Sequence, residues 1–480
     1  MINRQEIMDF SREFGLRPDM VEKDYVLGWL LAGISNHKEL AANWVFKGGT
    51  CLKKCFFETY RFSEDLDFTI NDPGHLDGEF LGNVFREISE WVYEKTGIEL
   101  PRELIRFEIY ANPRGKLSVE GRIRYRGPLQ ISPRRDLPRI KLDLTNDEIL
   151  VLMPEPREMH HPYSDRPEEG IHIQCYSFEE LFAEKVRALA ERLRPRDLYD
   201  VIHLYRHGDD RKDRSLILST LKKKCEFKNI PIPTIESLQN KPARTELETE
   251  WENMLGHQLP MLPPFEQFWN ELPVIFEWLY RAVEKAAPSP IPLMGVAVDE
   301  TWRPPPMAYA WHTTIPLEII RFAAANRLCV DLTYNRTQRT IEPYSLRRTR
   351  DGNLVLFAVK RATGEDRSYR VDRIQGAVVT KIPFTPRYMV ELTASGPISI
   401  QPTIRRGISS RGFGPGEIGL SHRSPRKRTP EFGPKYIFQC SLCGKHFTHK
   451  SYDASLNPHK NKQGYPCPGR YGVYITTKIK

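Results

Sequence analysis

The chain has 480 residues, 40% of them hydrophobic and 11% aromatic, which is enough for two or three folded domains and excludes a disordered protein. Its longest apolar run, Val26–Ile34, is far shorter than the roughly 20 residues that cross a bilayer, and residues 1–10 lack the apolar core of a secretory signal. We therefore expect a cytoplasmic protein without membrane contact, whose eight cysteines are reduced thiols or metal ligands.

The net charge of +9 is concentrated at one end of the chain. Residues 401–480 contain 15 Lys and Arg against three acidic residues, whereas residues 1–400 contain 56 basic and 59 acidic residues. A basic tail of this kind favours contact with nucleic acid, and a purely solubilising tail is the alternative.

Two stretches of unusual composition divide the chain. Proline is frequent in residues 287–306 and interrupts helices there, and residues 405–435 are rich in Gly, Pro, Ser and Arg. These stretches predict two linkers, at 287–306 and 405–435, between three domains, at 1–286, 307–404 and 436–480.

Hydrophobic spacing in the first segment predicts both helices and strands. Strands followed by a block of helices indicate an α+β domain. The expected elements are an amphipathic helix at Glu22–Ile34, a strand at Asn43–Phe46, a helix at Cys51–Thr59, strands at Phe62–Ile70 and Arg139–Thr145, and helices at Ser177–Leu193 and Phe265–Val283.

Two features of this segment suit phosphate and metal chemistry. Gly48, Gly49 and Thr50 lie at a strand-to-helix turn, where glycine lets backbone amides approach a phosphate. Asp65 and Asp67 alternate along a strand and therefore project from one face, and hard cations such as Mg²⁺ prefer carboxylate oxygens.

A third acid, Asp143, lies between apolar neighbours on a later alternating strand. It can complete a metal site or accept the proton of an attacking hydroxyl group. Taken singly, each of these features is also typical of an ordinary turn or of a solvated strand face.

Together, the glycine turn, the Asp-x-Asp strand and the third acid match the pattern of the nucleotidyltransferase superfamily. Over roughly residues 1–285 the chain more specifically resembles the AbiEii/AbiGii toxin family of nucleotidyltransferases. The stretches that carry this resemblance are Glu22–Tyr25, Lys47–Thr50, Arg61–Phe68, Glu179–Leu189 and Arg194–Asp200.

The resemblance implies a polymerase-β-like nucleotidyltransferase domain with a helical C-terminal part. It implies Mg²⁺-dependent transfer of NMP from an NTP to RNA, with tRNA the expected acceptor, and a resulting block of translation in phage defence or in a toxin–antitoxin system. A cognate antitoxin is a further expected partner. The implied catalytic residues are Asp65, Asp67, Asp143, Lys185 and Asp197, with Asp65 and Asp67 holding Mg²⁺ and either Asp197 or Asp200 orienting Lys185. The implied nucleotide-binding residues are Gly48, Gly49, Thr50, Ser63, Lys185 and Arg187.

Two alternatives use the same residues differently. One is a regulatory nucleic-acid-binding protein with an inactive or secondary transferase domain. The other is an enzyme that transfers NMP to a protein side chain.

The second segment opens with a predicted helix, Pro316–Ala325, and continues as short strands with turn signals. It resembles a WYL domain, which implies an SH3-like β fold that senses a ligand or nucleic acid, although the triplet that names the family reads Leu354-Val355-Leu356 here. The candidate ligand or nucleic-acid contacts, which can equally form a solvated charged rim, are Tyr334, Arg347, Arg348, Arg370 and Arg373.

The tail contains a cysteine pair on a tight turn, followed by a later His and Cys. Because so short a module cannot build a core of its own, this pattern favours a structural Zn²⁺ site. His446 and His449 follow the pair too closely to be favoured ligands. The surrounding bases and aromatics suit RNA or DNA, including a phage nucleic acid that acts as a trigger. The predicted zinc ligands are Cys440, Cys443, His459 and Cys467.

Overall fold

The protein forms two compact units, Met1–Ile404 and Arg405–Lys480. In the first unit, the computed structural model describes residues 1–57, 59–112, 114–129, 137–207, 213–239, 244–281, 288–302 and 317–392. In the second unit it describes residues 434–440, 443–449, 454–456, 459–460, 466–467 and 472–479.

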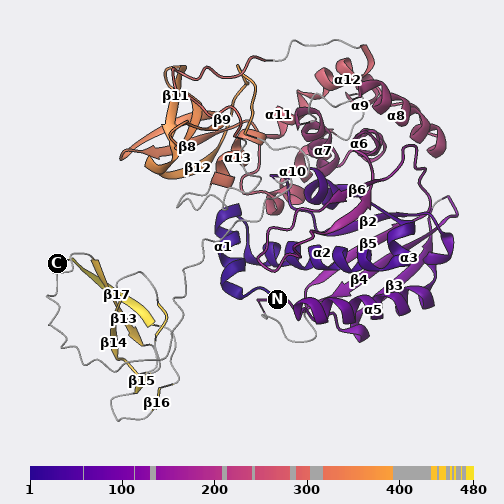
Figure 1. Ribbon diagram of the computed structural model, residues 1–480, viewed down its shortest axis with the longest axis horizontal. Helices are drawn as coiled ribbons and strands as arrows, with labels where there is room; N and C mark the ends of the chain where they lie inside the picture. Colours follow the sequence, from indigo (N-terminus) through magenta and orange to yellow (C-terminus); the bar gives the residue numbers. More distant parts are fainter. Residues whose placement is uncertain are drawn as a thin grey trace, which may run out of the picture. The chain divides into compact units, whose positions relative to one another are not determined.

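A seven-stranded mixed sheet forms the centre of the first unit (Figure 1). Its strands are β1 Trp44–Lys47, β2 Asp65–Ile70, β3 Arg106–Ala111, β4 Leu117–Arg124, β5 Arg139–Thr145, β6 Glu155–Glu158 and β7 His172–Cys175. The strand order is β3-β4-β5-β2-β1-β7-β6, with β2 parallel to β5 and β1 parallel to β7. The other neighbours are antiparallel, so the predicted α+β class is confirmed.

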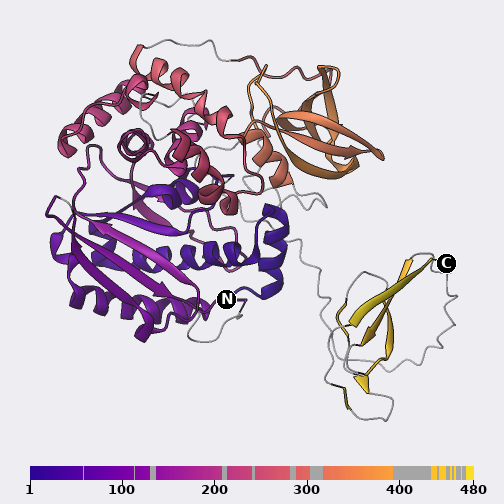
Figure 2. The same cartoon turned by 180° about the vertical axis from the view of Figure 1, so that it is seen from behind.

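The helices of the first 100 residues show as indigo and violet ribbons in Figures 1 and 2, and those from residue 18 onward contact this sheet. They are α1 Arg4–Phe14, α2 Pro18–Asn36, α3 Lys38–Asn43, α4 Gly48–Cys51, which runs into a π-helical turn at Leu52–Phe56, and α5 Gly78–Thr96. Short 3-10 turns lie at Pro73–Leu76, Arg102–Leu104, Gly256–Gln258 and Val371–Arg373.

The sequence predicted α2 as an amphipathic helix, and this was wrong. The helix is buried along nearly its whole length, including the acidic Glu22 and Asp24. Burial is possible because both carboxylates have partners. The Leu129 amide donates to Glu22 at 2.6 Å, and Lys54 Nζ lies 2.6 Å from Asp24 Oδ2.

A second group of helices follows the sheet in sequence: α6 Phe178–Arg192, α7 Pro195–His207, α8 Arg214–Lys228, α9 Ile235–Gln239, α10 Arg244–Leu255, α11 Phe265–Trp269 and α12 Leu272–Arg281. Ser177 caps α6 as predicted, because its hydroxyl accepts from the Glu180 amide at 3.2 Å. The single helix predicted at Phe265–Val283 was wrong. A break separates α11 from α12, and Pro273, which cannot continue a helix from the preceding turn, lies at the start of α12.

The last part of the first unit is a β domain that one helix precedes in the sequence. It contains α13 Leu317–Ala325, β8 Leu328–Tyr334, β9 Thr337–Arg348, β10 Leu354–Lys360, β11 Glu365–Arg370 and β12 Ile374–Pro383. All neighbours in the five-stranded sheet β11-β10-β9-β8-β12 are antiparallel. Residues 288–302 of the predicted first linker pack on this domain, where Ile291 and Val298 are buried with Phe357.

The second unit contains β13 Pro434–Cys440, β14 His446–His449, β15 His459–Lys460, β16 Pro466–Cys467 and β17 Gly472–Ile479. Strands β14, β13 and β17 form one small sheet, and β15 pairs with β16. Phe438 and Leu456 form a small apolar cluster with Cys440 and Cys467. Among the helices that the structure describes in either unit, none has the length and apolar character needed to cross a membrane.

Candidate active site

Three carboxylates share one face of the central sheet. Asp65 and Asp67 lie two residues apart on β2, and Asp143 on β5 is the register partner of Asp67 in a parallel pair. The alternating residues Leu66 and Leu142 are buried on the opposite face. The fold therefore brings together the three acids that the sequence singled out, although 76 positions separate Asp67 from Asp143.

These carboxylates repel one another in a buried setting. Burial first, and then the charges of Asp143 and Asp65, raise the pKa of Asp67 to about 6, against the opposing effect of Lys47 and Lys185. Burial likewise raises the pKa of Asp143, and Lys141, 2.9 Å away, opposes that rise. A divalent cation would relieve this repulsion, so the donor set fits Mg²⁺.

The glycine turn between β1 and α4 touches the acids directly. Gly48 has φ +82°, and a Cβ placed there would lie 2.1 Å from Asp67 Oδ2. A Cβ on Gly49 would lie 2.4 Å from Arg61 Nη2 and 3.0 Å from Ser63 Oγ. Both glycines therefore make room for polar side chains of the site, and any side chain at position 48 would displace a carboxylate.

Thr50 follows this turn and is buried. Its hydroxyl donates to the backbone carbonyl of Asp65, and it thereby joins α4 to the start of β2. This contact makes Thr50 a link between the glycine turn and the acidic strand.

Helices α6 and α7 bring a buried ion cluster to the site, centred on Asp200. Lys185 Nζ lies 2.8 Å from Asp200 Oδ2 and 3.7 Å from Asp197 Oδ1. Arg61 donates two hydrogen bonds to Asp200, of 2.7 and 2.8 Å, and the Tyr60 hydroxyl donates to the same carboxylate at 2.5 Å. Both aspartates suggested by the sequence therefore face Lys185, and Asp200 makes the shorter contact.

The charges in this cluster stabilise one another. Burial opposes ionisation of Asp200, but Arg61 and Lys185 hold its pKa well below the usual range. Burial would lower the pKa of Lys185, and the charges of Asp200 and Asp197 raise it overall. Arg192 in turn holds Asp197 with hydrogen bonds of 2.6 and 2.8 Å. Lys185 is thus a fixed cation.

Further charged groups at the site were not singled out from the sequence. Lys47 Nζ lies 3.8 Å from Glu184 Oε1, and Lys224 lies 3.3 Å from Glu184 Oε2. Arg196 lies 4.0 Å from Asp65. Lys47 and Arg196 fall inside stretches that carried the family resemblance, but sequence spacing cannot show which acid each of them meets.

Arg187, predicted to clamp the nucleotide, points to a different set of partners. Its guanidinium lies 3.2 Å from Glu148 and 2.6 Å from Glu191, and the residue is buried. It therefore joins α6 to the segment that follows β5.

Most of the predicted contact residues of the β domain already have partners within the first unit. Arg347 pairs with Glu391, Arg348 lies 2.6 Å from Asp299, and Arg370 lies 2.8 Å from Asp372. The Tyr334 ring packs edge-on against Tyr369, and Arg373 is exposed in a 3-10 turn. A polyanion that contacts these three arginines would compete with the carboxylates that already pair with them.

In the second unit, four thiol and imidazole groups gather, all with ligand atoms within 4.8 Å of one another. The sulfur of Cys443 lies 3.2 Å from Nε2 of His459, and the sulfurs of Cys440 and Cys467 lie 3.8 Å apart. The four residues are those predicted from the sequence: Cys440, Cys443, His459 and Cys467. Three thiolates and one imidazole are a donor set that fits tetrahedral Zn²⁺.

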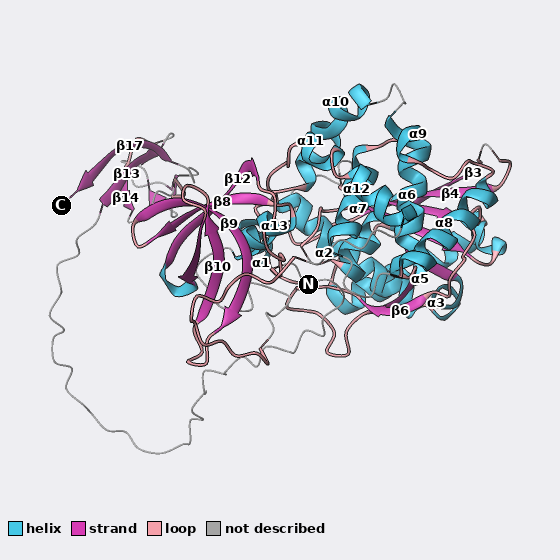
Figure 3. Ribbon diagram, turned by 90° about the horizontal axis from the view of Figure 1, so that it is seen from above, coloured by secondary structure: helices cyan, strands magenta, loops and turns pink. Residues whose placement is uncertain are grey.

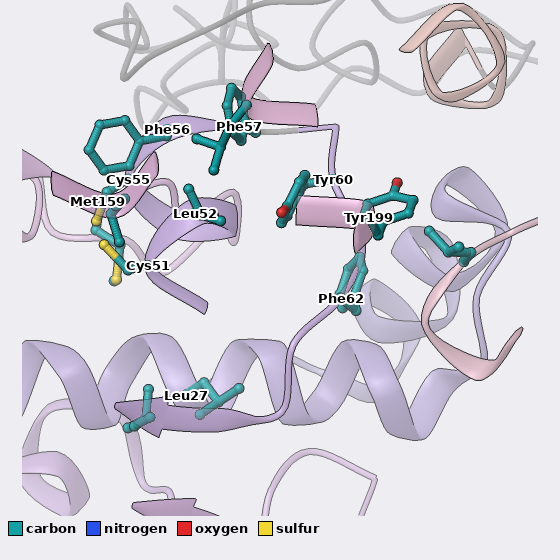
Figure 4. Packing of buried hydrophobic residues seen from close by; sticks show 14 of the residues in the cluster. Leu27, Cys51, Leu52, Cys55, Phe56, Phe57, Tyr60, Phe62, Met159 and Tyr199 are labelled. Carbon is teal, nitrogen blue, oxygen red and sulfur yellow. The ribbon is translucent and has the colours of Figure 1, made fainter. Parts of the chain in front are cut away.

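A second sulfur cluster was not expected from the sequence. The sulfur atoms of Cys51, Cys55 and Cys175 also lie within 4.8 Å of one another, and all three residues are buried in the core. Figure 4 shows Cys51 and Cys55. Met159 packs beside Cys51 and Cys55 in the same view. Buried thiols of this kind fill space as small apolar groups behind the glycine turn.

Three carboxylates beside a glycine turn, with a fixed Lys–Asp pair near them, suit the binding of a metal ion and a triphosphate. The family model described as "Nucleotidyl transferase AbiEii toxin, Type IV TA system" matches residues 29–271, which is just over half of the chain. The protein therefore belongs to the AbiEii nucleotidyltransferase toxin family, and residues 317–379 match the WYL domain model.

Among solved structures, the chain is similar to MenT4, a nucleotidyltransferase toxin from Mycobacterium tuberculosis H37Rv. It is 18% identical, with a TM-score of 0.41, and the alignment covers 59% of this chain and 91% of that chain. No curated protein sequence matches this chain.

Proposed function

We propose that this protein transfers a nucleoside monophosphate from an NTP to an RNA acceptor, with tRNA the first candidate. Loss of functional tRNA would block translation, as a toxin of phage defence or of a toxin–antitoxin pair does. The observation that carries this proposal is the face shared by Asp65, Asp67 and Asp143 directly beside Gly48.

The residues present fit a magnesium ion, since three carboxylates on one face repel one another. Asp65 and Asp67 would hold Mg²⁺, which when bound neutralises charge on the triphosphate. The backbone amides of Gly48 and Gly49 would lie against a phosphate, and Lys185 would contribute a fixed positive charge.

The remaining groups support these contacts. Asp197 and Asp200 hold Lys185 in place, and Ser63 lies next to the glycine turn. Thr50 and Arg187 would act by fixing helix positions, because the Thr50 hydroxyl and the two terminal guanidinium nitrogens of Arg187 already have protein partners.

In the reaction, an acceptor hydroxyl oxygen forms a bond to the α-phosphorus of the NTP. The bond between that phosphorus and the bridging oxygen to the β-phosphate breaks, and pyrophosphate leaves with the electron pair. Asp143, whose pKa is raised by burial, would take the hydroxyl proton.

The preference for RNA rests on charge. Residues 401–480 carry a large basic excess, and a Cys3His cluster of the type that holds structural zinc lies within that segment. We propose that a zinc-stabilised tail binds the acceptor or a phage nucleic acid.

We further propose that the transferase domain has a polymerase-β-like fold and the β domain an SH3-like fold. A cognate antitoxin would restrain the enzyme.

The test incubates the purified protein with Mg²⁺, each α-labelled NTP in turn, and total bacterial tRNA, with Asp67→Asn as a control. The proposal expects label in tRNA with at least one NTP and none with the variant. Label on protein instead of RNA would keep the chemistry and overturn the acceptor. If no labelled product forms even with phage nucleic acid added, the protein is a binding protein and the proposal fails.

A further inference from the structure

Helix α13, the first element of the WYL-matching segment, packs on both parts of the first unit. It contacts β8, β9 and β12 on one side and α1 on the other (Figure 3). Seven of its nine residues are buried, and one continuous hydrophobic cluster runs through it from the transferase domain into the β domain. A helix with two buried sides is part of both domains.

The N-terminal end of α13 holds the segment that leads into the active site. Glu318 accepts a hydrogen bond from the Thr59 hydroxyl and lies 3.2 Å from Arg321 Nη1. Thr59 immediately precedes Tyr60 and Arg61, the two residues that grip Asp200. A contact at Thr59 therefore acts on those residues through one or two peptide units.

The C-terminal end of α13 holds α7. The Asn326 side-chain oxygen accepts from the Tyr199 hydroxyl at 3.1 Å and lies 3.2 Å from His203 Nε2. The Asn326 amide nitrogen donates to the Phe322 carbonyl at 3.0 Å, which fixes the orientation of the amide group. The backbone carbonyl of Asn326 accepts from Gln267. Every polar group of this buried side chain is therefore used.

The two contacts converge on one aspartate. Tyr199 is the residue before Asp200 on α7, and its ring lies 5.7 Å from that of Tyr60, which binds Asp200 from the other side (Figure 4). Tyr199 also stacks on His203 at 4.2 Å. Helix α13 thus supports both segments that hold the Asp200–Lys185 pair.

We infer that Glu318 and Asn326 are positioning residues for nucleotidyl transfer, acting through Thr59 and Tyr199 on the Asp200–Lys185 pair. This inference rests on the proposed function. The β domain is then part of the catalytic unit, because a shift of α13 moves the groups that orient Lys185. Coupling of this kind travels through packed side chains and hydrogen bonds that have few alternative arrangements.

The test removes single hydroxyl groups and leaves the packing in place. Tyr199→Phe and Thr59→Val should each lower kcat at saturating NTP and acceptor by about two- to thirty-fold. Thr59→Ser, which keeps the hydroxyl, should have the kcat of the wild-type protein. The matched control is Tyr280→Phe, which removes a hydroxyl that donates to the Pro233 carbonyl in the loop before α9 and should leave kcat unchanged.

A second readout does not depend on catalysis. Amide hydrogen exchange in residues 59–63 and 195–203 should speed up in Tyr199→Phe and Thr59→Val, and exchange in β3 and β4 should stay unchanged. If the wild-type protein transfers no label, the proposed function fails. Amide hydrogen exchange then tests by itself whether Glu318 and Asn326 hold the two segments in position. Unchanged kcat together with unchanged exchange in both variants, or an equal loss in Tyr280→Phe, would overturn the inference.

Discussion

Asp67 on β2 and Asp143 on β5 lie directly opposite one another in a pair of parallel strands. Asp65 shares their face, and burial together with the charges of Asp143 and Asp65 outweighs the opposing effect of Lys47 and Lys185 on the pKa of Asp67. Repulsion among buried carboxylates is characteristic of a site that binds a cation, and it lowers the stability of the metal-free protein.

Replacing Asp67 with Asn should therefore stabilise the metal-free protein and abolish its activity. We expect a higher melting temperature in EDTA, loss of stabilisation by Mg²⁺, and a fall in transfer of about 10²–10³-fold or more. Thermal denaturation with and without Mg²⁺, next to a transfer assay, measures all three. Glu108→Gln, an exposed acid on edge strand β3, is the control and should respond to Mg²⁺ as wild type does. An Asp67→Asn protein that Mg²⁺ still stabilises fully would place the metal elsewhere.

Gly48 should tolerate no side chain. Gly48→Ala places a Cβ 2.1 Å from Asp67 Oδ2 on a residue with φ +82°, so both the carboxylate and the backbone must shift. We expect a stability loss of about 1–3 kcal/mol and near-complete loss of transfer. Gly82→Ala in α5, where a Cβ meets nothing within 4 Å, should be neutral or stabilising. Equal behaviour of the two variants in urea denaturation would contradict this assignment.

The two cations on Asp200 should differ in their effects. Lys185→Met leaves Asp200 paired with Arg61, so we expect a stability loss of only about 1 kcal/mol but a loss of transfer of about 10²-fold or more. Arg61→Met removes both of the guanidinium hydrogen bonds to buried Asp200 and should cost about 3–5 kcal/mol of stability. Denaturation curves and transfer rates on both proteins separate the two roles. A larger stability loss in Lys185→Met would reverse them.

How much of this site the sequence revealed depends on how local each contact is. The glycine turn, the Asp-x-Asp strand and the Ser177 cap follow from spacing along a few residues. The register that sets Asp67 against Asp143, and the grip of Arg61 on Asp200, join residues 76 and 139 positions apart, so only the fold shows them. The gathering of Cys440, Cys443, His459 and Cys467 was predictable because a cysteine pair on a tight turn with a later His and Cys is typical of a metal site.

Two errors have specific causes. We predicted an amphipathic helix α2 because acidic residues usually face solvent. Glu22 and Asp24 are instead buried, with partners that lie far away in the sequence. The helix expected at Phe265–Val283 contains Pro273, and the hydrophobic spacing outweighed that signal. The buried contacts of α13 with α7 had no sequence signal, because Asn326 resembles any residue at the end of a helix.

Glu13 at the contact of α1 with α13 should make stability depend on pH. Burial and the nearby charge of Glu318 raise its pKa from 4.5 to about 7, so between those values the folded protein holds a proton that the unfolded chain has lost. Stability contributed by this proton falls as pH rises through that interval. Glu13→Gln should therefore be more stable than wild type by about 1–2 kcal/mol at pH 8, with the difference vanishing below about pH 5. A difference independent of pH in denaturation curves would exclude this titration.

The tail cluster should bind one zinc ion per chain. Metal analysis of Cys443→Ser should show its loss, whereas Cys175→Ala, in the sulfur cluster of the core, should keep it. A chelator should unfold the second unit and leave the melting of the first unit unchanged. Full zinc content in Cys443→Ser would contradict the assignment.

The central claim is that the acids, the glycine turn and Lys185 transfer a nucleoside monophosphate. Parallel reactions with α-labelled and γ-labelled NTP, each with total tRNA and Mg²⁺, test it most directly. The account predicts that α-label enters the acceptor while γ-label appears in pyrophosphate, and that both signals vanish in Asp67→Asn. γ-Label in the acceptor, or α-label transfer that survives in Asp67→Asn, would contradict it.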